Sequence, residues 1–341
     1  MISPNSGSDR TEPLLSVKGL CVEFRHKGTA VRAVNGVDFE LFAGETLGIV
    51  GESGSGKSVT VLSLIGLIPQ PPGHIVSGEI RYKGVDIRAL SPSELRAVRG
   101  REIGVIFQDP MTSLNPVQKI GWQIAESIKL QSERDLSRAE VAARVVELLD
   151  SVGVPNPLER SRQYPHEFSG GMRQRAMIAI ANASEPTILI ADEPTTALDV
   201  TVQAQILDVL RTERKVDAAT ILITHDLGVI AEMADRVLVM YAGRVVETGD
   251  VETIFHRPRH PYTVGLLNSL PDRSTLSTPL IPIPGQPPNL NQVISGCAFY
   301  PRCSLSQGRS ICKSVRPPMV ETTSSDHRAA CHFAHELEDR A

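Results

Sequence analysis

The chain has 341 residues, of which 41% are hydrophobic and 22% are charged, and its formal net charge is −4. This length suits about two globular domains, and the composition is that of an ordinary folded protein. The slight negative charge argues against nucleic acid as a partner, because binding to the phosphate backbone needs a clustered basic surface. No run of about 18 apolar residues occurs, so no membrane-spanning helix is expected. The start, Met1–Glu12, is polar, which predicts a disordered leader over residues 1–13 and no secretion signal.

The first elements expected along the chain are strands. Leu14–Phe24 and Ala33–Leu41 are short apolar runs of the strand type, and a third run, Thr46–Val50, leads directly into a glycine-rich segment. An apolar, helix-like run, Val59–Ile68, follows that segment. The pattern predicts antiparallel strands that precede an α/β core.

The glycine-rich segment fits the phosphate-loop pattern G-x-x-x-x-G-K-[ST], and it lies between a strand and a helix as that loop requires. Its glycines allow a turn that points consecutive N–H groups inward, and the following helix adds the positive end of its dipole. We therefore expect a bound triphosphate, with Lys57 reaching the β- and γ-phosphates and the Ser58 hydroxyl ligating Mg²⁺. The expected nucleotide-binding residues here are Gly51, Ser53, Gly54, Ser55, Gly56, Lys57, Ser58 and Val59.

Strands alternate with helices further along the chain, which predicts a parallel sheet. The middle third is predicted to be mainly helical. The composition changes near His256, where prolines become frequent and the hydrophobic periodicity is lost. We expect one domain over residues 14–256 and a C-terminal extension over residues 257–341. The predicted strands are Gly78–Tyr82, Ile103–Phe107, Thr187–Ala191, Thr220–Thr224 and Arg236–Tyr241, and the predicted helices are Val117–Leu130, Ser137–Val152, Thr201–Val216 and Leu227–Ala234.

Two adjacent carboxylates, Asp192 and Glu193, end one of these apolar strands. Neighbouring residues that leave a strand point in different directions, so the two acids can do separate jobs. We expect Asp192 to hold Mg²⁺ and Glu193 to orient or deprotonate an attacking water molecule. The alternative is an acidic turn that caps the next helix.

Three further segments carry weak signals when each is taken singly. Gln108 and His225 each follow a predicted strand, where an amide could complete the Mg²⁺ shell and an imidazole could contact the γ-phosphate, although either residue could be an ordinary loop residue. Ser169-Gly170-Gly171 opens a helix and could bind an anion or simply cap that helix. Together with the phosphate loop, the two carboxylates and Ala197-Leu198-Asp199, these segments form an ordered set of high specificity.

This set resembles the ATP-binding subunit of an ABC transporter, over about residues 14–256. The resemblance implies a P-loop NTPase of ABC type, with a parallel-sheet core, an antiparallel β subdomain and a helical subdomain at about residues 112–182. It implies that each nucleotide lies between two subunits and that Phe24 stacks on adenine, although Phe24 could also be an ordinary strand aromatic. The residues implied for one site are the phosphate loop, Gln108, Asp192, Glu193 and His225, and those implied to cap the partner's nucleotide are Ser169, Gly170 and Gly171. Asp199 is a further expected nucleotide-binding residue.

The chain departs from the family pattern at two positions. The usual Leu-Ser-Gly-Gly-Gln begins with Phe168 and ends with Met172, and the usual Ser of Ser-Ala-Leu-Asp is Thr196. Met172 cannot offer an amide hydrogen bond. This departure puts in doubt whether the nucleotide site capped by this chain hydrolyses ATP as fast as the second nucleotide site of the dimer.

The region after the ATPase motifs narrows the resemblance. Pro258–Thr263 and the Thr196 form of the loop resemble the D-type ATPase of dipeptide and oligopeptide importers. That resemblance implies an F-type ATPase subunit as partner, two transmembrane permease subunits contacted through the helical middle and Asp109–Trp122, and, indirectly, an extracytoplasmic peptide-binding protein. It implies a peripheral position on the cytoplasmic face of the inner membrane. Importers of nickel, glutathione or murein peptides use similar motors and remain alternatives.

Four of the five cysteines gather in the extension, at Cys297, Cys303, Cys312 and Cys331, with the spacing C-x5-C-x8-C-x18-C. Four thiolates suit zinc or an iron–sulfur cluster, and the absence of a tight C-x2-C pair favours the cluster. The resemblance implies a [4Fe–4S] cluster, with zinc or unliganded thiols as alternatives. Its expected role is structural, because metal binding would supply folding energy to a segment with little periodic apolar sequence. The fifth cysteine, Cys21, is expected in the core.

Two other function classes compete with a transporter motor. Soluble ABC ATPases of DNA repair or translation usually carry a long coiled coil, zinc modules or two cassettes, whereas this sequence has one cassette and a short helical insert. A regulatory nucleotide-binding module without turnover would not need Glu193 and His225. We therefore expect an ATPase that drives import.

Overall fold

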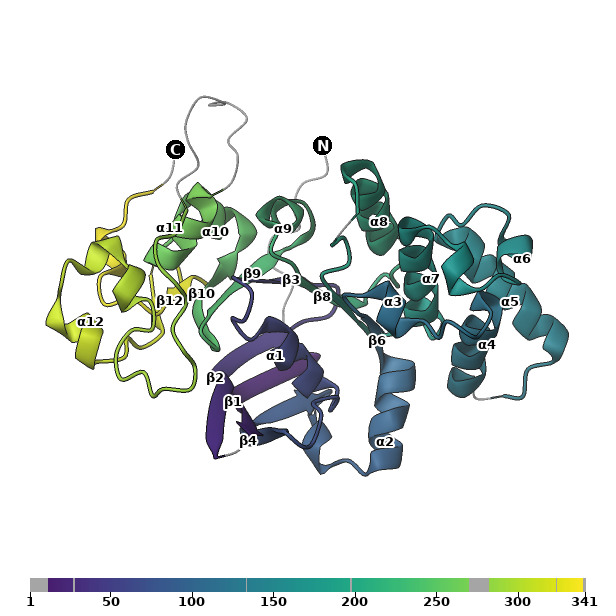
Figure 1. Cartoon of the computed structure of the whole chain (residues 1–341), viewed down its shortest axis with the longest axis horizontal. Helices are drawn as coiled ribbons and strands as arrows, with labels where there is room; N and C mark the ends of the chain where they lie inside the picture. Colours follow the sequence, from purple (N-terminus) through teal and green to yellow (C-terminus); the bar gives the residue numbers. More distant parts are fainter. Residues whose placement is uncertain are drawn as a thin grey trace.

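The computed structural model describes residues 12–26, 28–132, 134–196, 198–269, 282–322 and 324–339. Most of the predicted leader, residues 1–11, lies outside this part. Figure 1 shows two sheets at the centre of the molecule, a helical region on one side and the C-terminal extension on the other. Within the described residues, no helix has the length and apolar character needed to cross a membrane.

The smaller sheet is antiparallel and has the strand order β2-β1-β4-β5. Its central strand β1 (Leu15–His26) pairs with β2 (Thr29–Leu41) and with β4 (Gly73–Tyr82), and β5 is Val85–Asp86. β2 and β4 each begin four or five residues before the predicted strand. The first residues of β2 are mostly exposed, and the first residues of β4 lack an apolar alternation. Pairing with β1, and not the hydrophobic pattern, therefore holds these residues in the sheet.

The larger sheet has the order β11-β12-β10-β9-β3-β8-β7-β6. Its parallel core is apolar on both faces, as expected for strands covered by helices on each side. Functional side chains are expected where these strands end, because their carboxyl ends share one edge of the sheet. The parallel strands are β3 (Thr46–Val50), β6 (Ile103–Ile106), β7 (Ile188–Asp192), β8 (Ala219–Ile223) and β9 (Arg236–Tyr241).

Helices pack around this sheet and build the region at one side of Figure 1. α1 (Lys57–Leu64) packs on β1 and β2, whereas α7 (Gly170–Asn182) packs on α5 and α8. The helical region shares a hydrophobic core with β6 and β7, through residues such as Ile124, Val145 and Ile106. The remaining helices are α2 (Pro92–Ala97), α3 (Pro110–Ser113), α4 (Ile120–Gln131), α5 (Arg138–Ser151), α6 (Pro157–Arg160), α8 (Val200–Thr212) and α9 (Leu227–Met233).

Several helix boundaries differ from the predicted ones for local reasons. Ser137 is the N-cap of α5 and forms a capping box with Glu140, so that helix begins one residue later than predicted. α4 begins at Ile120, and α8 ends at Thr212, four residues before the predicted end. α2 was not predicted, and it begins at a second capping box, formed by Ser91 and Glu94, with no buried side chain.

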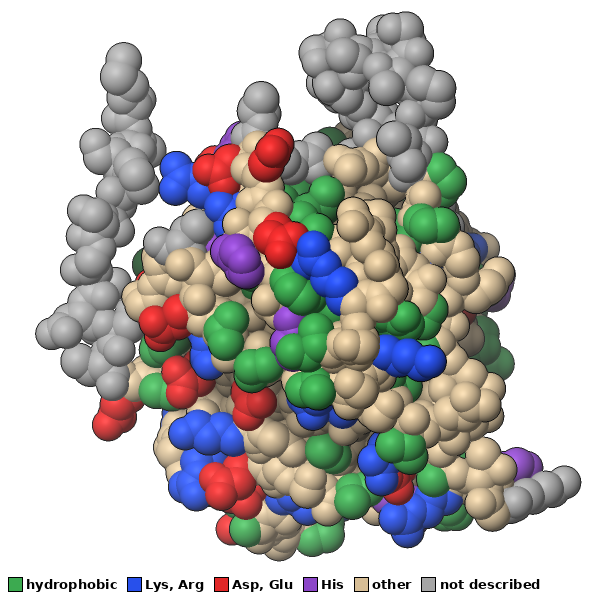
Figure 2. Space-filling view, turned by 90° about the vertical axis from the view of Figure 1, so that its left-hand side faces the viewer, with side chains coloured by type: hydrophobic (Ala, Val, Ile, Leu, Met, Phe, Trp, Pro, Cys, Tyr) green, Lys and Arg blue, Asp and Glu red, His purple; other side chains and the backbone are tan. Residues whose placement is uncertain are grey.

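The C-terminal extension continues the larger sheet. β10 (Arg244–Asp250), which was not predicted, pairs with β9 and with β12 (Arg328–Ala329), and β11 (Val320–Glu321) pairs with β12. α10 (Val251–His256) leads into the extension, whose own helices are α11 (Pro261–Asn268) and α12 (Ser310–Ser314). Figure 2 shows the face that the extension presents, where basic and acidic side chains are interspersed.

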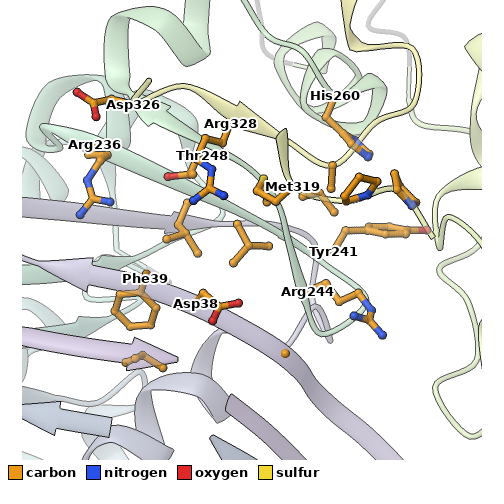
Figure 3. A pocket seen from close by; sticks show the side chains of 18 of the residues that line it. Asp38, Phe39, Arg236, Tyr241, Arg244, Thr248, His260, Met319, Asp326 and Arg328 are labelled. Carbon is orange, nitrogen blue, oxygen red and sulfur yellow. The ribbon is translucent and has the colours of Figure 1, made fainter. Parts of the chain in front are cut away.

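A cavity of about 1180 Å³ lies between β2, the β9–β10 hairpin and the extension (Figure 3). Its walls carry charges of both signs, among them Asp38, Arg236, Arg244 and Arg328. None of the predicted nucleotide-binding residues lines it in the described structure. The cavity instead separates much of the extension from the antiparallel sheet.

Candidate active site

The phosphate loop joins β3 to α1, and its glycines are required by their backbone angles and, at Gly51 and Gly56, also by the space around them. Gly51, Gly54 and Gly56 have φ angles of 152°, 76° and 102°. A Cβ atom on Gly51 would lie 2.2 Å from the Met240 carbonyl oxygen, and one on Gly56 would lie 2.4 Å from the Ala33 carbonyl oxygen. No side chain caps the start of α1. Its first N–H groups therefore suit an anion in the loop.

Lys57 lies inside this loop and is buried. Its Nζ atom donates hydrogen bonds to the carbonyl oxygens of Gly51, at 2.7 Å, and Glu52, at 3.2 Å. Burial lowers the pKa of Lys57, and the nearby carboxylates of Glu193 and Asp192 oppose that shift. A buried ammonium held among carbonyl oxygens is well placed to contact phosphate oxygens in the same loop.

Ser58 and Asp192 provide oxygen atoms beside the loop that fit a magnesium ion. Burial raises the pKa of Asp192, and a hydrogen bond with the Ser58 side chain opposes that shift. The Asp192 Oδ1 atom is buried and has no hydrogen-bond partner in the described structure. A hydroxyl, one carboxylate, water and phosphate oxygens are the ligands that Mg²⁺ commonly takes at nucleotide sites. The orphaned oxygen and the hydroxyl together match that donor set.

Glu193 brings together Gln108 and His225, which the sequence predicted separately, and Thr196, which the sequence marked only as a departure from the family pattern. Its Oε2 atom accepts hydrogen bonds from Gln108 Nε2, at 3.0 Å, and from Thr196 Oγ1, at 2.8 Å, and it lies 3.5 Å from His225 Nδ1. Glu193 has a φ of +48°, and its main-chain N–H donates to the Ile223 carbonyl at 2.8 Å. A non-glycine residue in this left-handed conformation is typical of active sites. The carboxyl ends of β6, β7 and β8 thus converge on one carboxylate.

Ser169-Gly170-Gly171 lies apart from the phosphate loop, on a different part of the fold (Figure 1). Ser169 is the N-cap of α7, and its hydroxyl accepts a hydrogen bond from the Met172 N–H at 3.3 Å. Ser169 and Gly170 are exposed. Asp199 caps α8 in the same way, through the Val202 N–H at 3.0 Å. The capping interpretation therefore holds within this chain, and the exposed turn remains available to a second one.

Phe24 and Cys21 both lie in β1 and are partly buried. The Phe24 ring packs against the core of the antiparallel sheet and lies 3.1 Å from where a Cβ on Gly73 would be. The ring is therefore a packed strand aromatic in this structure, and its predicted contact with adenine stays a prediction.

Two residues next to the site were missed by the sequence analysis, because both come from the extension. The main-chain N–H of Glu52 donates to the Tyr262 hydroxyl oxygen at 2.7 Å, and the Glu52 carboxylate accepts two hydrogen bonds from Arg302. Tyr262 belongs to the Pro258–Thr263 segment that the sequence singled out, and Arg302 directly precedes Cys303. The Pro258–Thr263 segment and Cys303 were therefore the sequence features that could have drawn attention to Tyr262 and Arg302. Neither feature indicates a contact with the phosphate loop.

The four cysteines of the extension line one small cavity, with His260, Phe299 and Phe333 among its other walls. Burial raises the pKa of Cys297 to about 11 and that of Cys331 to about 12, so both are thiols when no metal is bound. Main-chain N–H groups of Phe299 and Tyr300 point at the Cys297 sulfur, and that of Phe333 lies 3.4 Å from the Cys331 sulfur. In the part of the chain described here, no group of three or more His, Cys, Asp or Glu residues has the arrangement of a formed metal site.

Comparison with known families gives two matches. Residues 34–196 match the ABC transporter family, and residues 246–312 match the family described as the C-terminal region of oligopeptide and dipeptide transporters. The second match spans the boundary between β10 and the extension.

Curated relatives are similar over nearly the whole chain. The oligopeptide transport ATP-binding protein OppD of Bacillus subtilis is 52% identical over 320 residues, which cover 93% of this chain and 88% of that protein. The dipeptide transport ATP-binding protein DppD of the same organism is 49% identical and covers 94% of each chain.

Solved structures share the fold. A dimeric, post-hydrolysis form of the ATP-binding cassette MJ0796 bound to ADP and Pi has a TM-score of 0.63 and 25% identity, covering 70% of this chain and 98% of that one. The protein cbiO1 from Clostridium perfringens, part of the ABC transporter complex cbiONQ, has a TM-score of 0.60 and 27% identity, covering 72% and 91%. The fold class predicted from the sequence is confirmed.

Proposed function

Because this chain belongs to the ATP-binding proteins of ABC transporters, we propose that it is the motor of an importer for dipeptides or oligopeptides. It is an ATPase of that family. The relatives above are named for peptide transport, and the match over residues 246–312 is to a family of peptide transporters. These findings favour peptides over nickel, glutathione or murein peptides as cargo, and favour transport over DNA repair or translation.

The observation that carries the chemical proposal is the meeting of Gln108, Thr196 and His225 at Glu193, one residue from Asp192. Lys57 and the N–H groups of the loop would bind the β- and γ-phosphates. Ser58, Asp192 and Gln108 would hold Mg²⁺, which neutralises charge on the phosphate oxygens when it is bound. Glu193 would accept the proton of the attacking water, and His225 would orient that water or the γ-phosphate.

We propose that the complete site needs a second ATPase chain, of the F-type. Ser169, Gly170 and Gly171 form an exposed turn at a helix N-terminus, far from their own phosphate loop, which suits a role in capping the partner's nucleotide. Asp199 lies near this turn, since Leu198 is 3.7 Å from where a Cβ on Gly170 would be. The MJ0796 cassette is described as a dimer bound to ADP and Pi, which supports a functional unit of two ATPase chains.

Two permease subunits would bind at the segment that follows Gln108. Three large apolar side chains are exposed there, with Met111 at 56%, Val117 at 79% and Trp122 at 51%. A contiguous patch of exposed apolar side chains is typical of a docking surface, and the proposal is that these three contribute to one. We therefore place the protein at the cytoplasmic face of the inner membrane, with an extracytoplasmic peptide-binding protein acting through the permeases.

We also propose that Cys297, Cys303, Cys312 and Cys331 hold a [4Fe–4S] cluster, with zinc as the alternative. The support is that all four cysteines line one cavity and that main-chain N–H groups contact the sulfurs of Cys297 and Cys331, as suits thiolate ligands of a cluster. When bound, the cluster would tie together four segments of the extension and add to its folding free energy.

The test of the ATPase proposal is reconstitution. The full chain, mixed with an F-type ATPase subunit and two permeases, should hydrolyse ATP, and the rate should rise with a peptide-loaded binding protein. A chain that hydrolyses ATP at full rate as an isolated monomer, and binds no permease, would contradict the proposal.

A further inference from the structure

The C-terminal extension contacts the phosphate loop directly at Glu52. Arg302 Nη1 lies 2.7 Å from Glu52 Oε2, and Arg302 Nη2 lies 2.9 Å from Glu52 Oε1. The two bonds form a fork-to-fork pair, which fixes direction as well as distance. The Arg302 side chain is only 4% exposed and that of Glu52 is 26% exposed. The pair is therefore largely shielded from water and from salt.

Arg302 is held in place by groups of its own. Nε donates to the Pro284 carbonyl at 2.8 Å, Nη1 also donates to the Tyr241 hydroxyl at 3.3 Å, and Nη2 also donates to the Ile283 carbonyl at 3.4 Å. All five N–H groups of the guanidinium thus have a partner. Its carbon Cζ lies 5.8 Å from the centre of the Phe299 ring. The side chain has little freedom to move, so it can act as a fixed point for the loop.

Glu52 carries this contact to the lysine that would bind phosphate. Its main-chain N–H donates to Tyr262, its carboxylate accepts from Arg302, and its carbonyl accepts from Lys57 Nζ at 3.2 Å. The same carbonyl accepts from the Ser55 N–H at 3.1 Å, inside the loop. Every polar group of Glu52 is therefore engaged, and the extension holds two of them.

We propose that Arg302 is a positioning residue for ATP binding, which acts through Glu52 to hold the phosphate loop in the shape that receives the triphosphate. The inference rests on the proposed nucleotide site and adds to it a residue from outside the ATPase motifs. Arg302 does not touch the phosphates. Removing it frees the start of the loop, and a loop that must be ordered on binding has a lower affinity for its ligand.

The competing explanation is that Arg302 only stabilises the fold. The extension offers a matched control, the pair formed by Arg309 and Glu336, which is also two-pronged at 2.9 Å for both bonds. This pair lies within the extension and has no bond to the phosphate loop. Arg309→Gln therefore makes the same chemical change in the same part of the chain.

The experiment measures the Kd of ATP by calorimetry on the full chain, and the thermal midpoint of each variant beside it. We expect Arg302→Gln to weaken ATP binding about tenfold, since contacting charged pairs couple by energies of that size. Arg309→Gln should leave the Kd within about twofold of wild type, even where its midpoint falls. Wild-type affinity in folded Arg302→Gln would overturn the proposal, and it would leave the ATPase assignment intact.

A double-mutant cycle with Glu52→Gln tests the route through the loop. If Arg302 acts through Glu52, the double variant Glu52→Gln/Arg302→Gln should bind ATP no more weakly than Arg302→Gln alone. Additive losses would overturn that route. Should Arg302→Gln fail to fold, Arg302→Lys and Glu52→Gln supply the test, because each loses the fork and keeps a polar group; wild-type affinity in both would overturn the proposal. Absence of ATP binding by the wild-type chain would instead contradict the proposed function.

Discussion

Gln108 and Glu193 are joined by a hydrogen bond from the amide Nε2 of the first to the carboxylate Oε2 of the second, at 3.0 Å. Thr196 donates to the same oxygen at 2.8 Å, so the lone pairs of Oε2 are taken and Oε1 is left for a water molecule. The departure at position 196 thus keeps the hydroxyl that a serine would supply. Glu193 is held by residues from β6 and β7 in the orientation that its proposed role requires.

Lys57→Ala should abolish most nucleotide affinity, because it removes the one side-chain cation that bonds the carbonyls of the described phosphate loop. A charge-assisted contact with phosphate is worth a tenfold loss or more, about 1.5–3 kcal/mol. The measurement is ATP binding by calorimetry. Lys129→Ala, at an exposed position near the end of α4, is the control and should bind normally. Unchanged binding in Lys57→Ala would count against the assignment of the loop.

Glu193→Gln should keep ATP binding and lower the hydrolysis rate by roughly 10²–10⁴-fold, as expected when a general base is removed. Glutamine keeps the size of the side chain and can still accept from Gln108 and Thr196. The assay is steady-state phosphate release by the assembled complex, with size-exclusion chromatography to detect a trapped closed dimer. Turnover at the wild-type rate would mean that the base lies elsewhere.

Thr196→Val should slow hydrolysis by up to about tenfold, because it deletes the hydroxyl that bonds the charged Glu193 and keeps the side-chain volume. Thr196→Ser retains the hydroxyl and should hydrolyse ATP at nearly the wild-type rate. Both rates are measured at saturating ATP. Equal behaviour of the two variants would show that the hydroxyl has no part in placing Glu193.

Protein purified without oxygen should be brown, and replacement of Cys297, Cys303, Cys312 or Cys331 by serine should bleach it. Cys21→Ser is the matched control, since Cys21 lies in β1 and does not line the sulfur cavity, and its colour should persist. Iron and zinc are measured by elemental analysis. Colourless protein that contains one equivalent of zinc would contradict the cluster and support the zinc alternative.

Trp122→Asp should weaken binding of the permease subunits, because it places a charge on the exposed apolar segment after Gln108. ATP binding should be unaffected. Val216→Asp makes a similar change at an 89% exposed valine beyond α8 and should leave the permeases bound. The measurement is co-purification from membranes. Equal recovery of the permeases with both variants would contradict the proposal that this segment is the docking site.

The residues of the site could be predicted where the chemistry needs a fixed local pattern. The phosphate loop and the Asp192-Glu193 pair depend on local backbone geometry and on strand ends, which sequence periodicity reveals. Gln108 and His225 were predicted singly, at strand ends, and their convergence on Glu193 in the structure is explained by the rule that parallel strands end at one edge of the sheet. Fold class and enzyme class were accessible for the same reason.

The residues that were missed act across long separations in the chain. Arg302 lies 250 positions from Glu52 in the sequence, and neither the residue types nor their spacing predicts that the two form a pair. β10 was missed because the extension covers one of its edges, so Glu247 is fully buried within an otherwise unremarkable charged segment. The first residues of β2 and β4 were missed because pairing with the neighbouring strand β1 holds them, whereas their own sequence has no apolar alternation.

Glu247 limits how freely the parts of this protein can be exchanged with those of its relatives. Its carboxylate, in β10, accepts from the His260 N–H at 3.0 Å and contacts His327 Nε2 at 2.8 Å, so two separate stretches beyond residue 256 close over it. A hybrid that joined this cassette to a foreign tail would leave this acid without those donors and would expose the free edge of a strand. A graft that keeps this region intact must therefore transfer Glu247 together with His260 and His327.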